Sequence, residues 1–308
     1  GFEDNYEDQI FHPLLIERLS GFKSIRFMDW QRTNNNKIVT WADVTTPQSA
    51  SQAWSGKGVA PLYICKLANK LNIDPWICIP HQANDEYVTE LAQLMRDNLN
   101  SGLKLYVEYS NELWNYQFEQ AHYAGDTGVD QGLGNNDLLS NLHYNSRRSG
   151  QIFEIFEQVF GSENLVRVVG SQAANDWIGE QILEGLNDPS VNPTSSRPDA
   201  IAIAPYFAGS VANNIVTNGE VNSISIDEIL NRTEASIYFD TAVWVKEYKE
   251  LSQEFAVELI AYEGGQHLVG TGGNENIDVL TEKLIAANRD QRMKDIYLKN
   301  YAAWFDNG

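Results

Sequence analysis

The chain has 308 residues, of which 43% are hydrophobic and 11% aromatic, as is typical of a globular protein with a sizeable core. Its formal net charge of −20 argues against nucleic acid or an anionic membrane as a partner, because both bind a basic face, so a neutral or cationic substrate fits better. The sequence contains no run of about eighteen uncharged apolar residues, so no membrane span is predicted. We expect a soluble protein that is secreted or extracellular.

Apolar strand-like runs alternate with amphipathic helix-like runs along the chain. The apolar runs predict strands over Ser24–Trp30, Trp76–Pro80, Leu103–Tyr109, Leu165–Gly170, Ala200–Tyr206 and Glu258–Glu263. The amphipathic runs predict helices over Gln9–Gly21, Leu62–Leu71, Asn84–Asn100, Leu138–Phe160, Ile178–Leu186, Ile226–Gln253 and Ile277–Phe305. Repeated βα units predict a parallel sheet covered by helices.

Polar segments that carry Trp and Asn follow the predicted strands and do not precede them. This order favours an α/β protein with a (β/α)8 TIM barrel, whose chemistry lies on the loops at the carboxyl ends of the strands. A doubly wound open sheet is the alternative. It is disfavoured because no glycine-rich phosphate loop follows a strand, and Gly264-Gly265 lacks the required spacing. We expect one catalytic barrel domain over residues 1–308.

Six predicted strands are too few to close a barrel of eight. An open barrel exposes two unpaired strand edges, so we expect the chain to be part of a longer protein and to lack the first and last strands. Two long connections, Asn115–Asn136 and Ala208–Ser225, are predicted as loops, which at this length usually shape a binding cleft or are disordered.

Two of the predicted strands end in a carboxylate. The run Leu103–Tyr109 leads into Ser110-Asn111-Glu112-Leu113, and Glu263 ends the run that begins at Leu259. Carboxylates at the ends of separate strands can provide the proton donor and the nucleophile for cleavage of a glycosidic bond. Either carboxylate alone is more often an ordinary surface residue, but the two together predict a catalytic site.

The neighbours of both carboxylates fit this chemistry. Leu113 and Trp114 provide apolar surroundings of the kind that favour the protonated form of a general acid at Glu112. Asn111 can donate to a sugar hydroxyl. The glycines that follow Glu263 let the backbone turn sharply and let a substrate approach closely.

The Asn111-Glu112 pair and Glu263 resemble the catalytic residues of the clan A glycoside hydrolases, the retaining cellulase-like superfamily of TIM barrels. In that clan an Asn-Glu pair ends the fourth strand and carries the acid/base, and a Glu at the end of the seventh strand is the nucleophile. If the six predicted strands are counted as the second to the seventh, Glu112 and Glu263 fall on those positions. The resemblance covers nearly the whole chain as architecture, but only short stretches as sequence.

Three further residues match the clan pattern. Arg26 is similar to the second-strand Arg that holds the nucleophile, His81 to the third-strand His, and Tyr206 to the sixth-strand aromatic hydroxyl that bonds the nucleophile. A surface ion pair, a structural His and core packing are the respective alternatives. We expect the additional acidic residues Glu108 and Asp29 to pair with Arg26 inside the barrel.

Other candidates for sugar contact lie after the predicted strands. Gln172 and His267 can contact hydroxyls or a charged group. Flat indoles can stack on pyranose faces, and we expect about half of these to be loop anchors instead; the candidates are Trp30, Trp41, Trp54, Trp114 and Trp177. Many clan members also have a Trp on the eighth strand, which is not visible here, and Trp304 in a helix-like run is expected to lie in the core.

The sequence and this resemblance therefore predict a retaining, endo-acting hydrolase of a β-linked glycan, and carbohydrate-binding modules are a further expectation for the full-length protein. A non-catalytic carbohydrate-binding barrel and a hydrolase that uses another site remain alternatives. No cofactor or metal is expected, because no paired ligand spacing occurs among His81, His122, His143 and His267. Cys65 and Cys78 are too few for a disulfide scaffold and are expected to be buried thiols.

Overall fold

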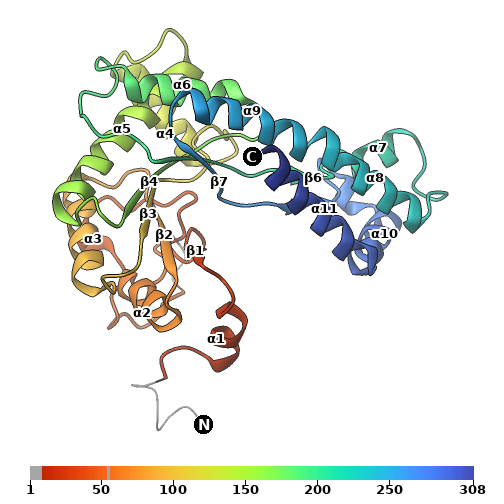
Figure 1. Ribbon diagram of the computed structural model, residues 1–308, viewed down its shortest axis with the longest axis horizontal. Coiled ribbons are helices and arrows are strands. Elements are labelled where there is room, and N and C mark those ends of the chain that lie inside the picture. The colour runs from red at the N-terminus through yellow and green to blue at the C-terminus, as the bar shows by residue number, and fades with distance from the viewer. Residues whose placement is uncertain (1–8, 54–55) are drawn as a thin grey trace. The chain divides into compact units, whose positions relative to one another are not determined.

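The computed structural model describes residues 9–53 and 56–308 (Figure 1). A sheet of six strands has the order β1-β2-β3-β4-β5-β7, which follows the order of the chain. This arrangement confirms the α/β class and is compatible with part of a (β/α) barrel. The first four strands pair in parallel; they are β1 (Ser24–Arg26), β2 (Asp74–Ile79), β3 (Leu105–Tyr109) and β4 (Leu165–Gly170).

The chain folds as two compact units. Unit 1 contains the residues up to Gly170 together with Gln181–Ala200, and unit 2 contains Ser171–Glu180 and Ile201–Gly308. The helix α6 (Asp176–Asn187) carries the chain from unit 2 into unit 1. In the part of the chain that the structure describes, no helix is both long and apolar enough to cross a membrane.

Several helices of unit 1 begin at a proline or at a capping asparagine. Pro13 and Pro61 occupy the first turns of α1 and α2, where a missing amide proton costs nothing. The side chains of Asn84 and Asn136 accept backbone bonds at the starts of α3 and α5. The helical elements of this unit are α1 (Pro13–Leu19), η1 (Trp41–Asp43), α2 (Pro61–Leu71), α3 (Asp85–Asn98), α4 (Glu119–Asp130) and α5 (Asp137–Val159).

The central strands of unit 1 are buried on both faces. Ile77, Cys78 and Ile79 of β2 are fully buried, as are Leu105 and Val107 of β3, which is the pattern expected of strands covered by helices. The structure confirms the prediction that both cysteines are buried, free thiols. Burial raises the pKa of the Cys65 thiol to about 12, so this group stays protonated.

The prediction of a loop over Asn115–Asn136 is wrong, because α4 occupies most of it. Its glycines suggested a loop, but they allow α4 to lie close against α5. A Cβ atom on Gly128 would lie 2.1 Å from the backbone oxygen of Ser140. Glycine lowers the stability of a helix, but at this position it allows the two helices to pack closely.

The helices of unit 2 are shorter and more numerous than the sequence predicted. The predicted helix Ile226–Gln253 is two helices, because the backbone leaves the helical conformation at Asp240 (φ −99°, ψ −87°). The predicted helix Ile277–Phe305 also divides, and the predicted loop Ala208–Ser225 contains α7. The elements are β5 (Ala200–Ile203), β6 (Tyr206–Phe207), α7 (Val211–Thr217), α8 (Ile226–Phe239), α9 (Thr241–Glu254), β7 (Glu258–Ala261), β8 (Gly265–Gln266), η2 (Asn274–Asn276), α10 (Asp278–Arg289) and α11 (Arg292–Asn307).

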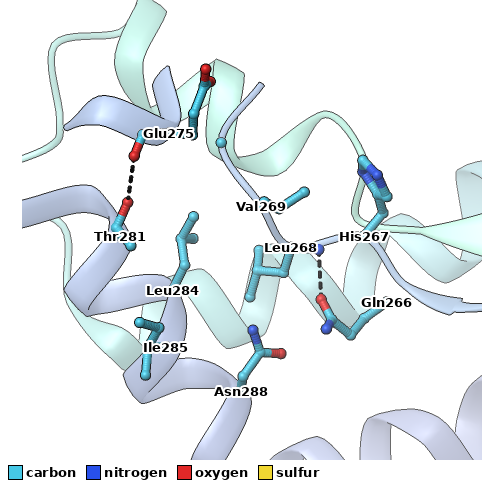
Figure 2. A pocket seen from close by; sticks show the side chains of 10 residues that line it. Gln266, His267, Leu268, Val269, Glu275, Thr281, Leu284, Ile285 and Asn288 are labelled. Atoms are coloured by element: carbon cyan, nitrogen blue, oxygen red, sulfur yellow. Dashed lines mark hydrogen bonds between the residues drawn. The ribbon is translucent and has the colours of Figure 1, made fainter. Parts of the chain in front are cut away.

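In addition to β5 and β7, unit 2 has a short sheet of two strands. Strands β6 and β8 pair in parallel, with Tyr206 opposite Gly265 and Phe207 opposite Gln266. The chain then passes along the face of α10, and residues Gln266 to Val269 lie opposite Leu284, Ile285 and Asn288 (Figure 2).

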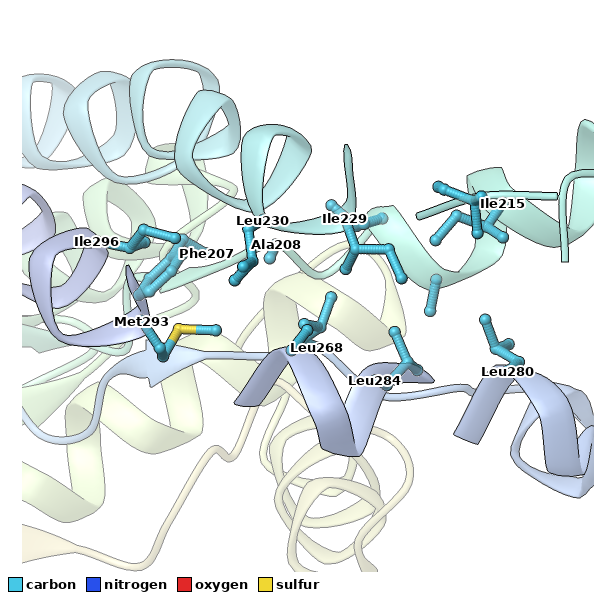
Figure 3. Packing of buried hydrophobic residues seen from close by; sticks show 14 of the residues in the cluster. Phe207, Ala208, Ile215, Ile229, Leu230, Leu268, Leu280, Leu284, Met293 and Ile296 are labelled. Atoms are coloured by element: carbon cyan, nitrogen blue, oxygen red, sulfur yellow. The ribbon is translucent and has the colours of Figure 1, made fainter. Parts of the chain in front are cut away.

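A cluster of buried apolar side chains holds these elements together (Figure 3). Phe207 of β6 and Leu268 after β8 pack with side chains from α7, α8, α10 and α11, which include Ile215, Ile229, Leu230, Leu280, Leu284, Met293 and Ile296. Full burial of each large apolar side chain contributes about 1.5–3 kcal/mol. The cluster therefore fixes β6 and the segment after β8 relative to α10.

Candidate functional site

In unit 1, the predicted pairing of Arg26 with Glu108 is confirmed. Arg26 donates from Nε to Oε2 of Glu108 over 3.0 Å and from Nη2 to Oε1 over 3.1 Å. Trp76 and Cys78 of β2 also donate to this carboxylate. Burial raises the pKa of Glu108, and the charge of Arg26 and these hydrogen bonds oppose that shift. Asp29, in contrast, is exposed, so its predicted place inside the barrel is wrong.

The same Arg26 side chain orients the amide of Asn111. Nη2 of Arg26 donates to Oδ1 of Asn111 over 2.8 Å, and Nδ2 of Asn111 donates to Oδ1 of Asn34 over 2.9 Å. Because an amide nitrogen carries two protons, and Asn34 takes one of them, the second N–H of Asn111 has no acceptor among the described residues. Asn111 is 3% exposed, so this orientation is held within a buried network.

Gln120 of α4 completes this network, and sequence reasoning missed it. Its Nε2 donates to Oδ1 of Asn34 over 2.7 Å and to the backbone oxygen of Asn111 over 3.0 Å. Gln120 is fully buried. Neither Asn34, in a run of three asparagines, nor Gln120, in the segment predicted as a loop, carries a sequence signal for this role.

The backbone around Glu112 adopts an unusual conformation. Ser110 and Glu112 have φ values of 60° and 43°, in the left-handed region that non-glycine residues rarely enter. Nδ2 of Asn115 donates to Oε2 of Glu112 over 2.9 Å. Strained residues of this kind cluster at functional sites, so the turn fits a role in positioning Glu112. The half-buried Trp114 has a buried Nε1 without a partner among the described residues.

His81 lies at the end of β2 as a buried, neutral ring. Burial lowers the pKa of His81 to about 4. Its Nε2 lies 3.3 Å from Nε2 of Gln82, and its ring makes an edge contact with Tyr123. Its Nδ1 is buried and has no partner in residues 9–53 and 56–308. A neutral imidazole can serve a ligand as donor or acceptor.

In unit 2, the predicted hydrogen bond between Tyr206 and Glu263 is present. The Tyr206 hydroxyl donates to Oε2 of Glu263 over 2.7 Å. The ring of Tyr206 makes an edge contact with His267 at 5.8 Å between centroids. His267 is held by its own backbone amide, which donates to the oxygen of Phe207 over 2.7 Å.

Glu263 also lines a cavity of about 330 Å³ that has an aromatic wall. Tyr262, Tyr301, Trp304 and Phe305 contribute to this wall. Trp304 is half-buried, so the expectation that it lies in the core is wrong. Amphipathic spacing alone could not distinguish a side chain that packs in the core from one that borders a cavity.

The remaining candidates have different environments. Trp30 stacks on Phe11 and meets Phe27 edge-on, and Trp41 meets Tyr87, which are contacts typical of loop anchors. Trp177 is 40% exposed on α6. Gln172 is half-buried, and its backbone oxygen accepts from the Tyr248 hydroxyl. Trp54 lies outside the described residues.

The site residues thus form two groups. Unit 1 brings together Arg26, Asn111 and Glu112 at the ends of β1 and β3, and unit 2 brings together Tyr206, Glu263 and His267. Within the described ranges, no group of three or more His, Cys, Asp and Glu side chains is arranged to hold a metal ion.

Comparison with known proteins gives little further information. No protein-family profile matches this chain, and no curated protein matches it. Among solved structures, the chain is similar to the YdhT protein from Bacillus subtilis, with 10% sequence identity and a TM-score of 0.32 over 71% of this chain. The match spans 62% of the YdhT chain.

Proposed function

We propose that the protein is a retaining glycoside hydrolase on a (β/α)8 TIM barrel, with Glu263 as the nucleophile and Glu112 as the acid/base. The observation that carries this proposal is the 2.7 Å hydrogen bond from Tyr206 to Glu263. It holds one carboxylate oxygen in a fixed direction at the end of β7, as a nucleophile requires. The constrained turn at Glu112 and the buried orientation of Asn111 support the same assignment.

In the proposed first step, Glu263 attacks the anomeric carbon while Glu112 donates a proton to the leaving oxygen. A covalent glycosyl-enzyme forms, and the leaving group departs as an alcohol. In the second step, Glu112 takes a proton from water, which attacks the anomeric carbon and releases Glu263. Two displacements retain the anomeric configuration, and the two carboxyl groups must come within about 5–5.5 Å of each other.

Asn111 has a defined role in this scheme. Since Arg26 occupies its Oδ1 and Asn34 takes one of its N–H groups, the other N–H is available for the 2-hydroxyl of the sugar. A hydrogen bond at that hydroxyl strengthens as positive charge develops at the anomeric carbon. Glu108 keeps Arg26 in place and takes no part in the reaction.

The substrate class proposed is a neutral, β-linked polysaccharide or oligosaccharide cleaved internally, and we propose a secreted or extracellular enzyme. Aromatic side chains beside Glu263 fit the apolar faces of pyranose rings. The net charge of −20 is compatible with a neutral glycan and unfavourable for an anionic one.

A screen of β-linked glucans, mannans and xylans with the full-length protein tests the proposal. We expect hydrolysis of at least one glycan, with the anomeric configuration retained in the first product seen by NMR. Glu112→Gln should lower kcat by about 10²–10⁴-fold on substrates with poor leaving groups. Glu263→Gln should remove hydrolysis, whereas Glu258→Gln, at an exposed position of β7, should not. Full activity in both Glu112→Gln and Glu263→Gln would place the chemistry elsewhere.

A further inference from the structure

A second cavity in unit 2 shares His267 with the group around Glu263 but not Tyr206 or Glu263. It has a volume of about 320 Å³, within the range of about 300–1,000 Å³ that is common for small-molecule pockets. One wall is the segment from Gln266 to Gly270 that follows β8, and the other is the face of α10 that carries Leu284, Ile285 and Asn288 (Figure 2).

The walls of this cavity are fixed by the core of unit 2. Leu268 and Leu284 are 3% and 4% exposed and belong to the apolar cluster of Figure 3. Oε1 of Gln266 accepts from the amide of Leu268 over 2.5 Å, which pins the segment after β8. A Cβ atom on Gly270 would lie 2.7 Å from the backbone of Asn274, so close approach there requires glycine. The cavity is therefore preformed.

Two amide groups border this cavity with unused hydrogen-bonding capacity. Figure 2 shows the Asn288 side chain between Ile285 and Gln266. Among the described residues, neither the Asn288 amide nor Nε2 of Gln266 has a hydrogen-bond partner. The cavity thus presents donors and an acceptor beside the aliphatic side chains of Leu268 and Ile285.

This lining selects a class of ligand. No lysine or arginine lines the cavity, and it includes Glu275, so an anion is disfavoured. A purely apolar ligand would leave both amides desolvated and unpaired, which costs free energy. A pyranose ring fits both requirements, because its C–H faces are apolar and its hydroxyls pair with amides.

The cavity is connected to the candidate nucleophile through His267. This residue lines the cavity, its ring contacts Tyr206, and Tyr206 bonds Glu263. We propose that the cavity is an accessory subsite for one uncharged pyranose unit of the substrate, separate from the unit that Glu263 attacks. This inference rests on the proposed glycosidase function.

The test measures kcat/KM for β-linked gluco-, manno- and xylo-oligosaccharides of two to six units on the full-length protein. Asn288→Leu removes both hydrogen-bonding groups of one amide. Gln266→Glu keeps the acceptor for the Leu268 amide and removes only the Nε2 donor. Gln291→Leu, at an exposed position outside the cavity, is the matched control.

In the wild type, we expect kcat/KM to rise at the substrate length at which the oligosaccharide first reaches the cavity. In both cavity variants, kcat/KM on these longer substrates should be about 3- to 10-fold lower than in the wild type. Activity on the shortest cleaved substrate should be unchanged. Losses that are equal at all lengths, or absent in both variants while the wild type hydrolyses the series, would overturn the subsite alone. Absence of hydrolysis of every glycan by the wild type would overturn the proposed function and the subsite together.

Discussion

The hydroxyl of Tyr206 lies 2.7 Å from Oε2 of Glu263 and donates a hydrogen bond to it. A hydrogen bond to a charged acceptor contributes about 1.5–3 kcal/mol. We expect Tyr206→Phe to lower kcat by about 10- to 100-fold with little change in KM, because the bond orients the nucleophile and does not hold substrate. Tyr238→Phe, at a position that is 64% exposed, is the control and should retain full kcat. An unchanged kcat in Tyr206→Phe would show that this bond has no catalytic role.

Arg26 and Glu108 form a buried ion pair, with side chains that are 8% and 2% exposed. Removing one partner leaves the other charge buried without compensation, so Glu108→Leu should lower the free energy of unfolding by about 3–5 kcal/mol. The double variant Arg26→Met/Glu108→Leu should lose less than Glu108→Leu alone. Denaturant unfolding of the wild type, Glu108→Leu and the double variant gives the free energies of unfolding. Lys37→Gln, which breaks an exposed ion pair, is the control and should have little effect. A double variant that loses as much as Glu108→Leu alone, or more, would contradict this account of the pairing.

Gln120 holds Asn111 directly, at its backbone oxygen, and indirectly through Asn34, so the effect of removing its amide should depend on the substrate. Gln120→Met keeps the length of the side chain but removes three hydrogen bonds, to Asn34, to the backbone of Asn111 and from the amide of Asn35, so we expect kcat to fall by about 10-fold on the natural glycan. On a 2-deoxy substrate, which lacks the hydroxyl that Asn111 is proposed to bind, the fall should be much smaller. Gln253→Met at an exposed position should change neither rate. Equal losses on both substrates would indicate a general structural role.

The buried His81 makes stability depend on pH. Its pKa is about 4 in the folded protein and about 6.5 when unfolded, so only the unfolded chain takes up a proton between these values. The contribution of His81 to stability is complete above pH 6.5 and is lost as the pH falls towards 4, by about 3 kcal/mol in all. His81→Gln should flatten the pH dependence of the unfolding free energy in this window. Identical profiles for the variant and the wild type would refute the shift.

Much of the framework was predictable from the sequence, because buried parallel strands are apolar on both faces and stand out as runs. β4 was predicted at its observed bounds, and the pairing of Arg26 with Glu108 followed from opposite charges on two predicted strands of one barrel. The helix α4 was not predictable, since its glycines resemble a loop until α5 is seen to pack against them. Asn34 and Gln120 could not be identified either, because their roles depend on contacts between distant segments.

The most direct test of the central claim is covalent trapping of the nucleophile. A 2-deoxy-2-fluoro glycosyl fluoride slows both displacements but retains a good leaving group, so the glycosyl-enzyme accumulates and can be located by peptide mass spectrometry. The sugar chosen should match the glycan that the full-length protein hydrolyses. We predict one added glycosyl group on the peptide that contains Glu263, and none in Glu263→Gln. Labelling of a different residue, or turnover with inverted configuration and no label, would contradict the assignment of Glu263 as nucleophile.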